Sequence, residues 1–160
     1  MEQQLKEQFH KAFYDVIRES IRDGNHDHIV RLYAEIADRI ASKVKPTGRT
    51  HQRIREDFDV DLFRQMLQHN AFSGQSLLGL VNTTFKWIRD LQMPIRDADT
   101  AAAKQRVMES GTSMEEVVPA YIKEVHGCLD TLDQDLKEFY ENRNHPVVQH
   151  MLQQAAGLRK

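Results

Sequence analysis

Three side chains able to bind a metal recur at helical spacing in the last third of the chain: His126, Asp130 and Asp133. Residues three and four apart share one face of a helix, so these three would project from one helix edge. Imidazole and carboxylate groups are ligands for divalent metals. Three ligands from a single helix coordinate weakly without a partner from another helix. A solvated helix edge is therefore the favoured interpretation, and no metal or cofactor is predicted.

Other arrangements of residues that carry chemistry are missing. The seven glycines form neither GxGxxG nor GxxxxGK, so the usual phosphate-binding loops are absent. No His-Glu-x-x-His and no paired cysteines occur. The single cysteine, Cys128, has no cation one helical turn away that would stabilise a thiolate, so a buried structural role is favoured. No catalytic residue is predicted, and the protein is not expected to be an enzyme.

Five positive charges surround the connector at residues 46–48. They are Lys43, Lys45, Arg49, Arg53 and Arg55. Such a cluster can hold the phosphates of a nucleic acid or of an anionic membrane surface. Four carboxylates follow within residues 56–61, and no aromatic residues are interleaved for base stacking, so a self-neutralising surface is favoured. The five residues remain candidates for binding a partner.

Two further residues are candidates for binding a partner. Trp87 is predicted at the solvent-leaning side of its helix, where it could anchor a partner, although packing between helices is favoured. Arg96 sits on a stiff corner between Pro94 and Asp97. Its planar guanidinium could instead reach a carboxylate or carbonyl of a neighbouring helix, and this structural use is slightly favoured.

Length and composition bound the class of protein. The 160 residues are 40% hydrophobic, which suffices for one core, so a single domain over residues 1–160 is predicted. The 22 Lys and Arg nearly balance 24 Asp and Glu, so the overall field does not steer the chain toward nucleic acid. One cysteine, no N-terminal apolar leader and no membrane-length apolar run together favour a cytoplasmic location.

Apolar residues recur at intervals of three and four along most of the chain, and no segment alternates as a strand does. The pattern predicts an all-α fold, a single-domain bundle of six or seven helices. The predicted helices span about residues 5–21, 27–40, 60–67, 73–92, 98–108, 113–140 and 146–155. The segment that begins at Arg49 is expected to be polar chain leading into the third of these helices.

Local signals set the predicted helix ends. Gly24 suits a left-handed C-cap, Asn70 is a plausible terminator, and Pro94 stops the preceding helix. The residues placed to start helices are Asp27, Ser73, Asp97 and Ser113, the last in a capping box with Glu116. The first helix is expected to bury Leu5, Phe9, Phe13, Val16, Ile17 and Ile21.

Parts of the chain also resemble a known family. The run Asp59–Gln65 (DVDLFRQ), the pair Ser76–Leu77 and the turn Pro94–Asp97 (PIRD) are similar to the T-complex protein 11 family. Members of that family carry an Asp-leading helix and a Pro-Val-Arg-Asp-like turn. The resemblance implies a helical regulatory or scaffolding domain without an assigned active site. It also implies a protein partner in cAMP-dependent protein kinase signalling, such as a kinase subunit.

The family's domain usually runs to several hundred residues, so this chain is expected to match its N-terminal part. A short relative and a fragment are both open. The expected function is non-catalytic protein binding, through a helix groove or the basic cluster. The alternative is electrostatic binding of nucleic acid or an anionic membrane through residues 43–55, and self-association is a further expectation.

Overall fold

The computed structural model describes residues 2–142, 146–147, 149–150 and 153–154. Within them the chain forms seven α-helices and one short 3-10 helix, with no strand, so the all-α prediction is confirmed. The elements are α1 (Glu2–Arg22), α2 (Asp27–Ala41), α3 (Arg49–Asp57), α4 (Val60–Gln68), α5 (Gly74–Leu91), η1 (Pro94–Arg96), α6 (Asp97–Met108) and α7 (Met114–Glu141). Of the helix predicted over residues 146–155, the described residues 146–147, 149–150 and 153–154 are helical, and the other four lie outside the described residues.

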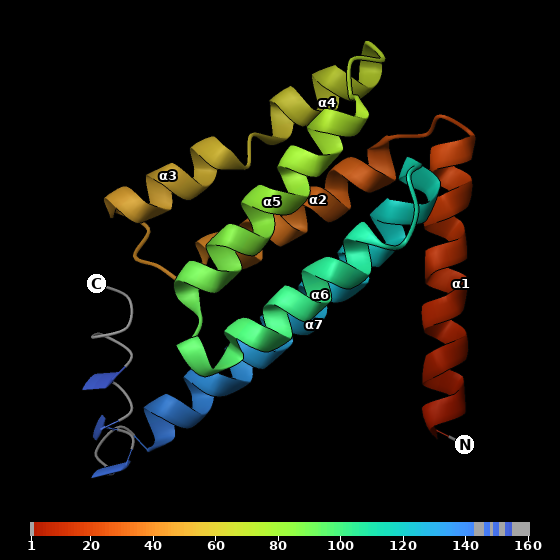
Figure 1. Ribbon diagram of the computed structural model, residues 1–160. Helices are drawn as coiled ribbons and strands as arrows, with labels where there is room; N and C mark the ends of the chain where they lie inside the picture. Colours follow the sequence, from red (N-terminus) through yellow and green to blue (C-terminus); the bar gives the residue numbers. More distant parts are fainter. Residues whose placement is uncertain (1, 143–145, 148, 151–152, 155–160) are drawn as a thin grey trace.

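Helix α7 is the centre of the arrangement. It packs against α1, α2, α5 and α6, while α3 and α4 pack against α2. Figure 1 shows α2, α5, α6 and α7 running obliquely beside one another, with α3 and α4 as an outer row. Helix α1 stands at the opposite side, and its N-terminal end points away from the other helices (Figure 1). None of the described helices is both long and apolar enough to cross a membrane.

The core lies between α7 and the helices that surround it. The apolar stripe of α7 is buried at Val118, Tyr121, Ile122, Val125, Leu129 and Leu132, and that of α2 at Ile29, Leu32, Tyr33, Ile36 and Ile40. A buried hydrogen bond of 2.8 Å joins Thr84 Oγ1 of α5 to the Tyr121 hydroxyl of α7. Thr84 Oγ1 also donates to the Leu80 carbonyl, so these buried polar groups are satisfied.

Side-chain caps start three of the helices. Asp59, Ser73 and Ser113 each accept a hydrogen bond from a backbone N–H of the first turn, so the caps predicted at Ser73 and Ser113 are confirmed. The caps predicted at Asp27 and Asp97 are wrong by one position, because both are the first residues of their helices. A carboxylate there still interacts favourably with the positive end of the helix dipole.

Helix ends follow the predicted signals closely. Gly24 has a φ of 74° and Asn70 a φ of 54°, the left-handed conformation that terminates a helix. The chain leaves α5 at Gln92, two residues before Pro94, as expected from the restriction that proline places on its predecessor.

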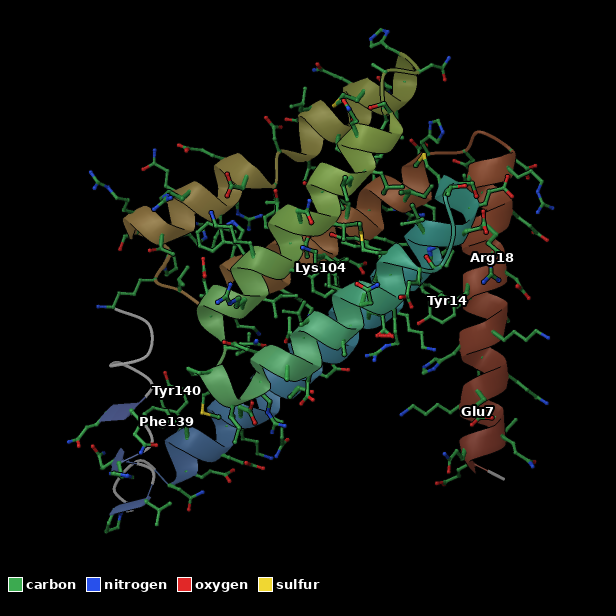
Figure 2. The ribbon with its side chains drawn as sticks, viewed as in Figure 1. Glu7, Tyr14, Arg18, Lys104, Phe139 and Tyr140 are labelled. Atoms are coloured by element: carbon green, nitrogen blue, oxygen red, sulfur yellow. The ribbon has the colours of Figure 1, made fainter. Side chains whose placement is uncertain are left out.

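The buried face predicted for α1 is wrong in most of its residues. Only Ile17 is buried, whereas Leu5, Phe9, Phe13 and Val16 are exposed, Phe9 to 72%. The helix packs through an adjacent face, on which Tyr14 points toward the α6–α7 side of the molecule (Figure 2). Apolar periodicity reports that a stripe exists but not whether another helix is within reach to cover it.

The sequence pattern predicts polar chain from Arg49, but the structure has helix α3 there. Ile54 is its one buried residue, and its N-cap is Gly48, which offers no side chain to cap the first turn. The helix forms because α2 covers it: Ile54 is fully buried, and Arg55 pairs with Asp38 of α2 at 2.8 Å. Tertiary packing outweighs weak local propensity here.

Truncation of a leucine distinguishes the true core from the exposed stripe of α1. Leu129→Ala removes a fully buried side chain and is expected to lower the free energy of unfolding by about 2–5 kcal/mol. Leu5→Ala, at a residue 54% exposed, is expected to cost less than about 0.5 kcal/mol. Urea denaturation followed by circular dichroism measures both. Similar losses in the two variants would contradict the placement of α1.

Candidate functional site

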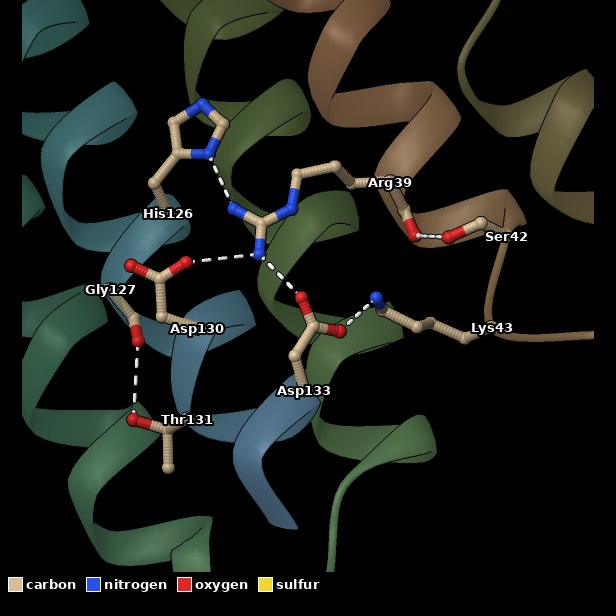
Figure 3. Close-up of polar contacts among 8 residues, drawn as sticks. All are labelled: Arg39, Ser42, Lys43, His126, Gly127, Asp130, Thr131 and Asp133. Atoms are coloured by element: carbon tan, nitrogen blue, oxygen red, sulfur yellow. Dashed lines mark hydrogen bonds and ion pairs between the residues drawn. The ribbon is translucent and has the colours of Figure 1, made fainter. Parts of the chain in front are cut away.

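Helix α2 places Arg39 against the edge of α7 that carries the three metal-capable side chains (Figure 3). Arg39 Nη2 donates to Asp130 Oδ1 at 3.0 Å and to Asp133 Oδ2 at 2.8 Å. Its Nη1 lies 2.8 Å from His126 Nδ1. Lys43, also from the C-terminal side of α2, donates from Nζ to the other oxygen of Asp133.

The helix edge is therefore an ion-pair network, and the prediction of a merely solvated edge is wrong. The guanidinium of Arg39 lies between the three side chains, within hydrogen-bond distance of each (Figure 3). Among the described residues, no group of three or more His, Cys, Asp or Glu converges on a metal position. This cluster joins α2 to α7, and its charges pair with one another at the partly exposed boundary between the two helices.

Burial and charge set the protonation of the cluster. Burial lowers the pKa of His126, and the adjacent positive charge of Arg39 lowers it further. The neutral imidazole then accepts from Arg39 at Nδ1, which assigns the ring proton to Nε2. Burial alone would raise the pKa of Asp133, but hydrogen bonds from Lys43 and Arg39, together with their charges, bring that pKa below its ordinary value.

Arg96 makes the contact that the structural interpretation predicts. Its Nε and Nη2 donate to the two oxygens of Asp135 on α7, both at 3.0 Å. Asp135 is 6% exposed, so the fork of Arg96 satisfies a buried carboxylate. The hydrogen bond and charge of Asp135 raise the pKa of Arg96, which stays cationic. This pair ties the turn at η1 to α7.

Trp87 is buried, so the solvent-leaning position predicted for it is wrong. It is 6% exposed, and its Nε1 donates to Asp57 Oδ2 at 2.7 Å. Asp57 is the last residue of α3, the helix that the sequence pattern did not reveal. Because that side of α5 is covered, Trp87 acts in packing between helices and does not present an anchor on the surface.

Fewer cations of the basic cluster are available to a partner than the five that the sequence contains. Lys43 pairs with Asp133 and Arg55 pairs at the surface with Asp38, so two of the five cations already have a carboxylate partner within the chain. Lys45, Arg49 and Arg53 are exposed and have no ion pair with a described residue. Arg49 and Arg53 are one turn apart on α3 and share a face of it. These three residues are named the free basic triad below.

Cys128 is half-buried on the side of α7 that faces α6. Burial raises the pKa of its thiol, although a hydrogen bond with Thr100 and the charge of Arg106 act in the other direction. A raised thiol pKa lowers the thiolate fraction and therefore the reactivity. This environment agrees with the structural role that was favoured for Cys128.

A groove that no single sequence pattern predicts lies where α3 ends, between α4 and α5. Its volume is about 320 Å³. Its apolar lining consists of Tyr33, Phe58, Leu62, Phe63, Met66, Phe72 and Leu80. The ring centroid of Phe63 lies 4.5 Å from that of Tyr33 and 5.2 Å from that of Phe72, so the three rings form an aromatic floor. This surface is named the α4–α5 groove.

The rim of the α4–α5 groove is acidic. Glu56, Asp57 and Asp59 line it, and none of the three has an ion pair with a cation among the described residues. Burial raises the pKa of Tyr33 on the floor, and the negative charges of Asp59 and Asp57 raise it further. The groove therefore combines an apolar floor with a negative potential.

The face of α5 toward the groove carries small side chains. Ser76, Gly79 and Thr83 line it at intervals of three and four, the spacing of one helix face. A Cβ atom built at Gly79 meets no atom within 4 Å, so this part of the groove is open. The sequence contains this spacing of small residues, but only the position of α4 in the structure shows that they border a groove.

The chain matches a known family over most of its length. A family model described as T-complex protein 11 matches residues 1–146, which include all of the helices from α1 to α7. No solved structure matches the chain. Several residues that carry the resemblance line the α4–α5 groove, namely Asp59, Leu62, Phe63 and Ser76.

Arg96→Ala tests the clamp on α7. The change leaves the carboxylate of Asp135 buried without its partner, and it is expected to cost about 2 kcal/mol, below the value for a fully buried pair because Arg96 is 39% exposed. The melting temperature should fall by roughly 4–8 °C. Arg64→Ala, which removes an exposed pair with Asp61, is the control and should cost under about 0.5 kcal/mol. Equal melting temperatures for the two variants would refute the clamp.

The lowered pKa of His126 predicts a loss of stability in acid. The unfolded chain protonates this imidazole near its ordinary pKa of 6.5, whereas the folded chain does so only at lower pH. The contribution is therefore complete above pH 6.5 and is lost as the pH falls from there through the folded pKa. His126→Gln, which can still accept from Arg39, should flatten this part of the stability curve.

Proposed function

Because the chain belongs to the T-complex protein 11 family, we propose that it is a non-catalytic binding module for another protein, with a regulatory or scaffolding role. The partner proposed is a subunit of the cAMP-dependent protein kinase, which is the signalling system that the family resemblance implies. The proposed location is the cytoplasm. The α4–α5 groove is the proposed binding site.

The observation that carries the proposal is the apolar lining of the groove. Leu62 on the groove wall is 51% exposed, beside the partly buried Met66 and Phe72. Apolar pockets with aromatic and methionine side chains are where protein partners place their anchoring residues. The walls come from α4 and α5, whose first turns are fixed by the Asp59 and Ser73 caps, so the site is formed before a partner arrives.

The polar clusters support a binding role more than a catalytic one. Arg39 and Lys43 form hydrogen bonds with the carboxylates and the imidazole on α7, and Arg96 does so with Asp135. A general base or a nucleophile needs a free position within hydrogen-bond reach of a substrate. In these clusters that position is taken by a cation from the fold.

A second candidate function rests on the free basic triad. Lys45, Arg49 and Arg53 are exposed and lack ion pairs with described residues, so they could bind phosphates of a nucleic acid or of an anionic membrane. Three charges release few counterions, and the carboxylates at the end of α3 lie close by along the chain. Protein binding through the α4–α5 groove is therefore the preferred function.

The test uses the full chain and the purified regulatory and catalytic subunits of the cAMP-dependent kinase in a calorimetric titration. One subunit is expected to bind. Leu62→Gln should weaken that binding by about tenfold, or 1.4 kcal/mol, because it removes an apolar anchor from the groove. Leu78→Gln is the matched control, since Leu78 is a similarly exposed leucine on α5 outside the groove lining.

Three results would decide against parts of the proposal. Failure of both subunits to bind would reject the kinase partner. Equal effects of Leu62→Gln and Leu78→Gln would reject the groove as the binding site. Binding of RNA or anionic vesicles that disappears with salt, and with all three residues of the triad changed to Glu, would favour the second candidate.

A further inference from the structure

We propose that the α4–α5 groove accepts a basic amphipathic helix from the partner protein, with its apolar face on the aromatic floor and its lysines or arginines on the acidic rim. The inference rests on the proposed function and specifies the chemistry of the segment that binds. It does not depend on which protein supplies that segment.

The charge of the rim selects the partner. Glu56 accepts from Gln52, Asp57 from Trp87 and Asp59 from the backbone N–H of Leu62, but none of these donors carries a positive charge. The C-terminal end of α3, which adds a partial negative charge, lies at the same rim. Three carboxylates without a cation around an apolar floor favour a partner that brings positive charges, and they disfavour phosphates or an acidic peptide.

The shape of the groove favours a helix as the bound segment. Leu62 and Met66 are one turn apart on α4, and Ser76, Gly79 and Thr83 lie along one face of α5. Small side chains along one wall allow the backbone of an incoming helix to approach closely. Helix-in-groove recognition places apolar anchors at intervals of three and four residues, which match the exposed apolar positions of the opposite wall.

A small apolar cavity continues the groove into the core. It measures about 20 Å³ and shares Tyr33, Phe63, Phe72 and Leu80 with the groove. Its remaining lining includes Met114 and Val118 of α7. Because methionine side chains adapt their shape readily, Met66 in the groove and Met114 in the cavity, both partly buried, can adjust to a bulky anchor from the bound helix.

Gly79 provides a variant that blocks the groove without harming the fold. A side chain at this position enters open space, so Gly79→Leu fills the groove from the α5 wall. Replacing glycine inside a helix also favours helix formation by up to about 1 kcal/mol, so the variant should be at least as stable as the wild type. Gly127 on α7 is equally open and does not line the groove, which makes Gly127→Leu the matched control.

The experiment measures fluorescence anisotropy of a labelled synthetic peptide with the full chain. The peptide has leucine and lysine in an amphipathic helical pattern over about four turns, and a matched peptide carries glutamate in place of lysine. The wild type should bind the lysine peptide at least about tenfold more tightly than the glutamate peptide. Gly79→Leu should weaken binding of the lysine peptide by about tenfold or more, whereas Gly127→Leu should bind it as the wild type does.

Each other outcome overturns the inference in a distinct way. Equal binding of both peptides would remove the role of the acidic rim, and equal binding by the two glycine variants would place the site elsewhere. A wild-type dimer that Gly79→Leu disrupts in sedimentation analysis would make a second copy the occupant, through the exposed apolar residues of its α1. If neither peptide binds while a kinase subunit still binds the wild type, this inference fails and the proposed function stands.

Discussion

Burial of the apolar stripe of α7 is the interaction on which the rest of the structure depends. Four helices pack on this one element, and its residues Val125 and Leu129 are fully buried among them. Each such side chain contributes roughly 1.5–3 kcal/mol, more than an exposed ion pair does. Two arginines then fix the position of α7 toward its C-terminal end: Arg39 reaches it from α2 and Arg96 from η1. Apolar burial therefore holds the bundle together, and the charged contacts select one arrangement of it.

Much of the fold could be predicted because its signals are local. A left-handed residue at Gly24, a proline at Pro94 and a cap at Ser73 each act within one helical turn, so the chain alone reveals them. Helix α3 could not be predicted, since its formation depends on Ile54 being covered by α2. The exposed stripe of α1 was misassigned for the converse reason: its periodicity is that of a buried helix, but no described helix covers it.

The site was predictable only in part, because its contacts join residues far apart in the sequence. Arg39 and Asp133 are separated by more than 90 positions, and no local sequence pattern indicates that they form an ion pair. The basic cluster was visible as composition, yet only the fold shows that Lys43 and Arg55 are already paired. The α4–α5 groove is lined by residues of four helices, α2, α3, α4 and α5. The run from Asp59 to Gln65 contributes to one of its walls, but in the sequence these residues carry only the family resemblance and the pattern of an ordinary helix.

The most direct measurement of the central claim is a methyl NMR titration of the full chain with the lysine-bearing amphipathic peptide. Binding in the α4–α5 groove predicts the largest shift changes at the methyl groups of Leu62, Met66 and Leu80, which line it from both sides. The methyl groups of Leu5 and Val16 on α1 should be unaffected. Changes confined to α1, or no changes along the groove at saturating peptide, would contradict the account.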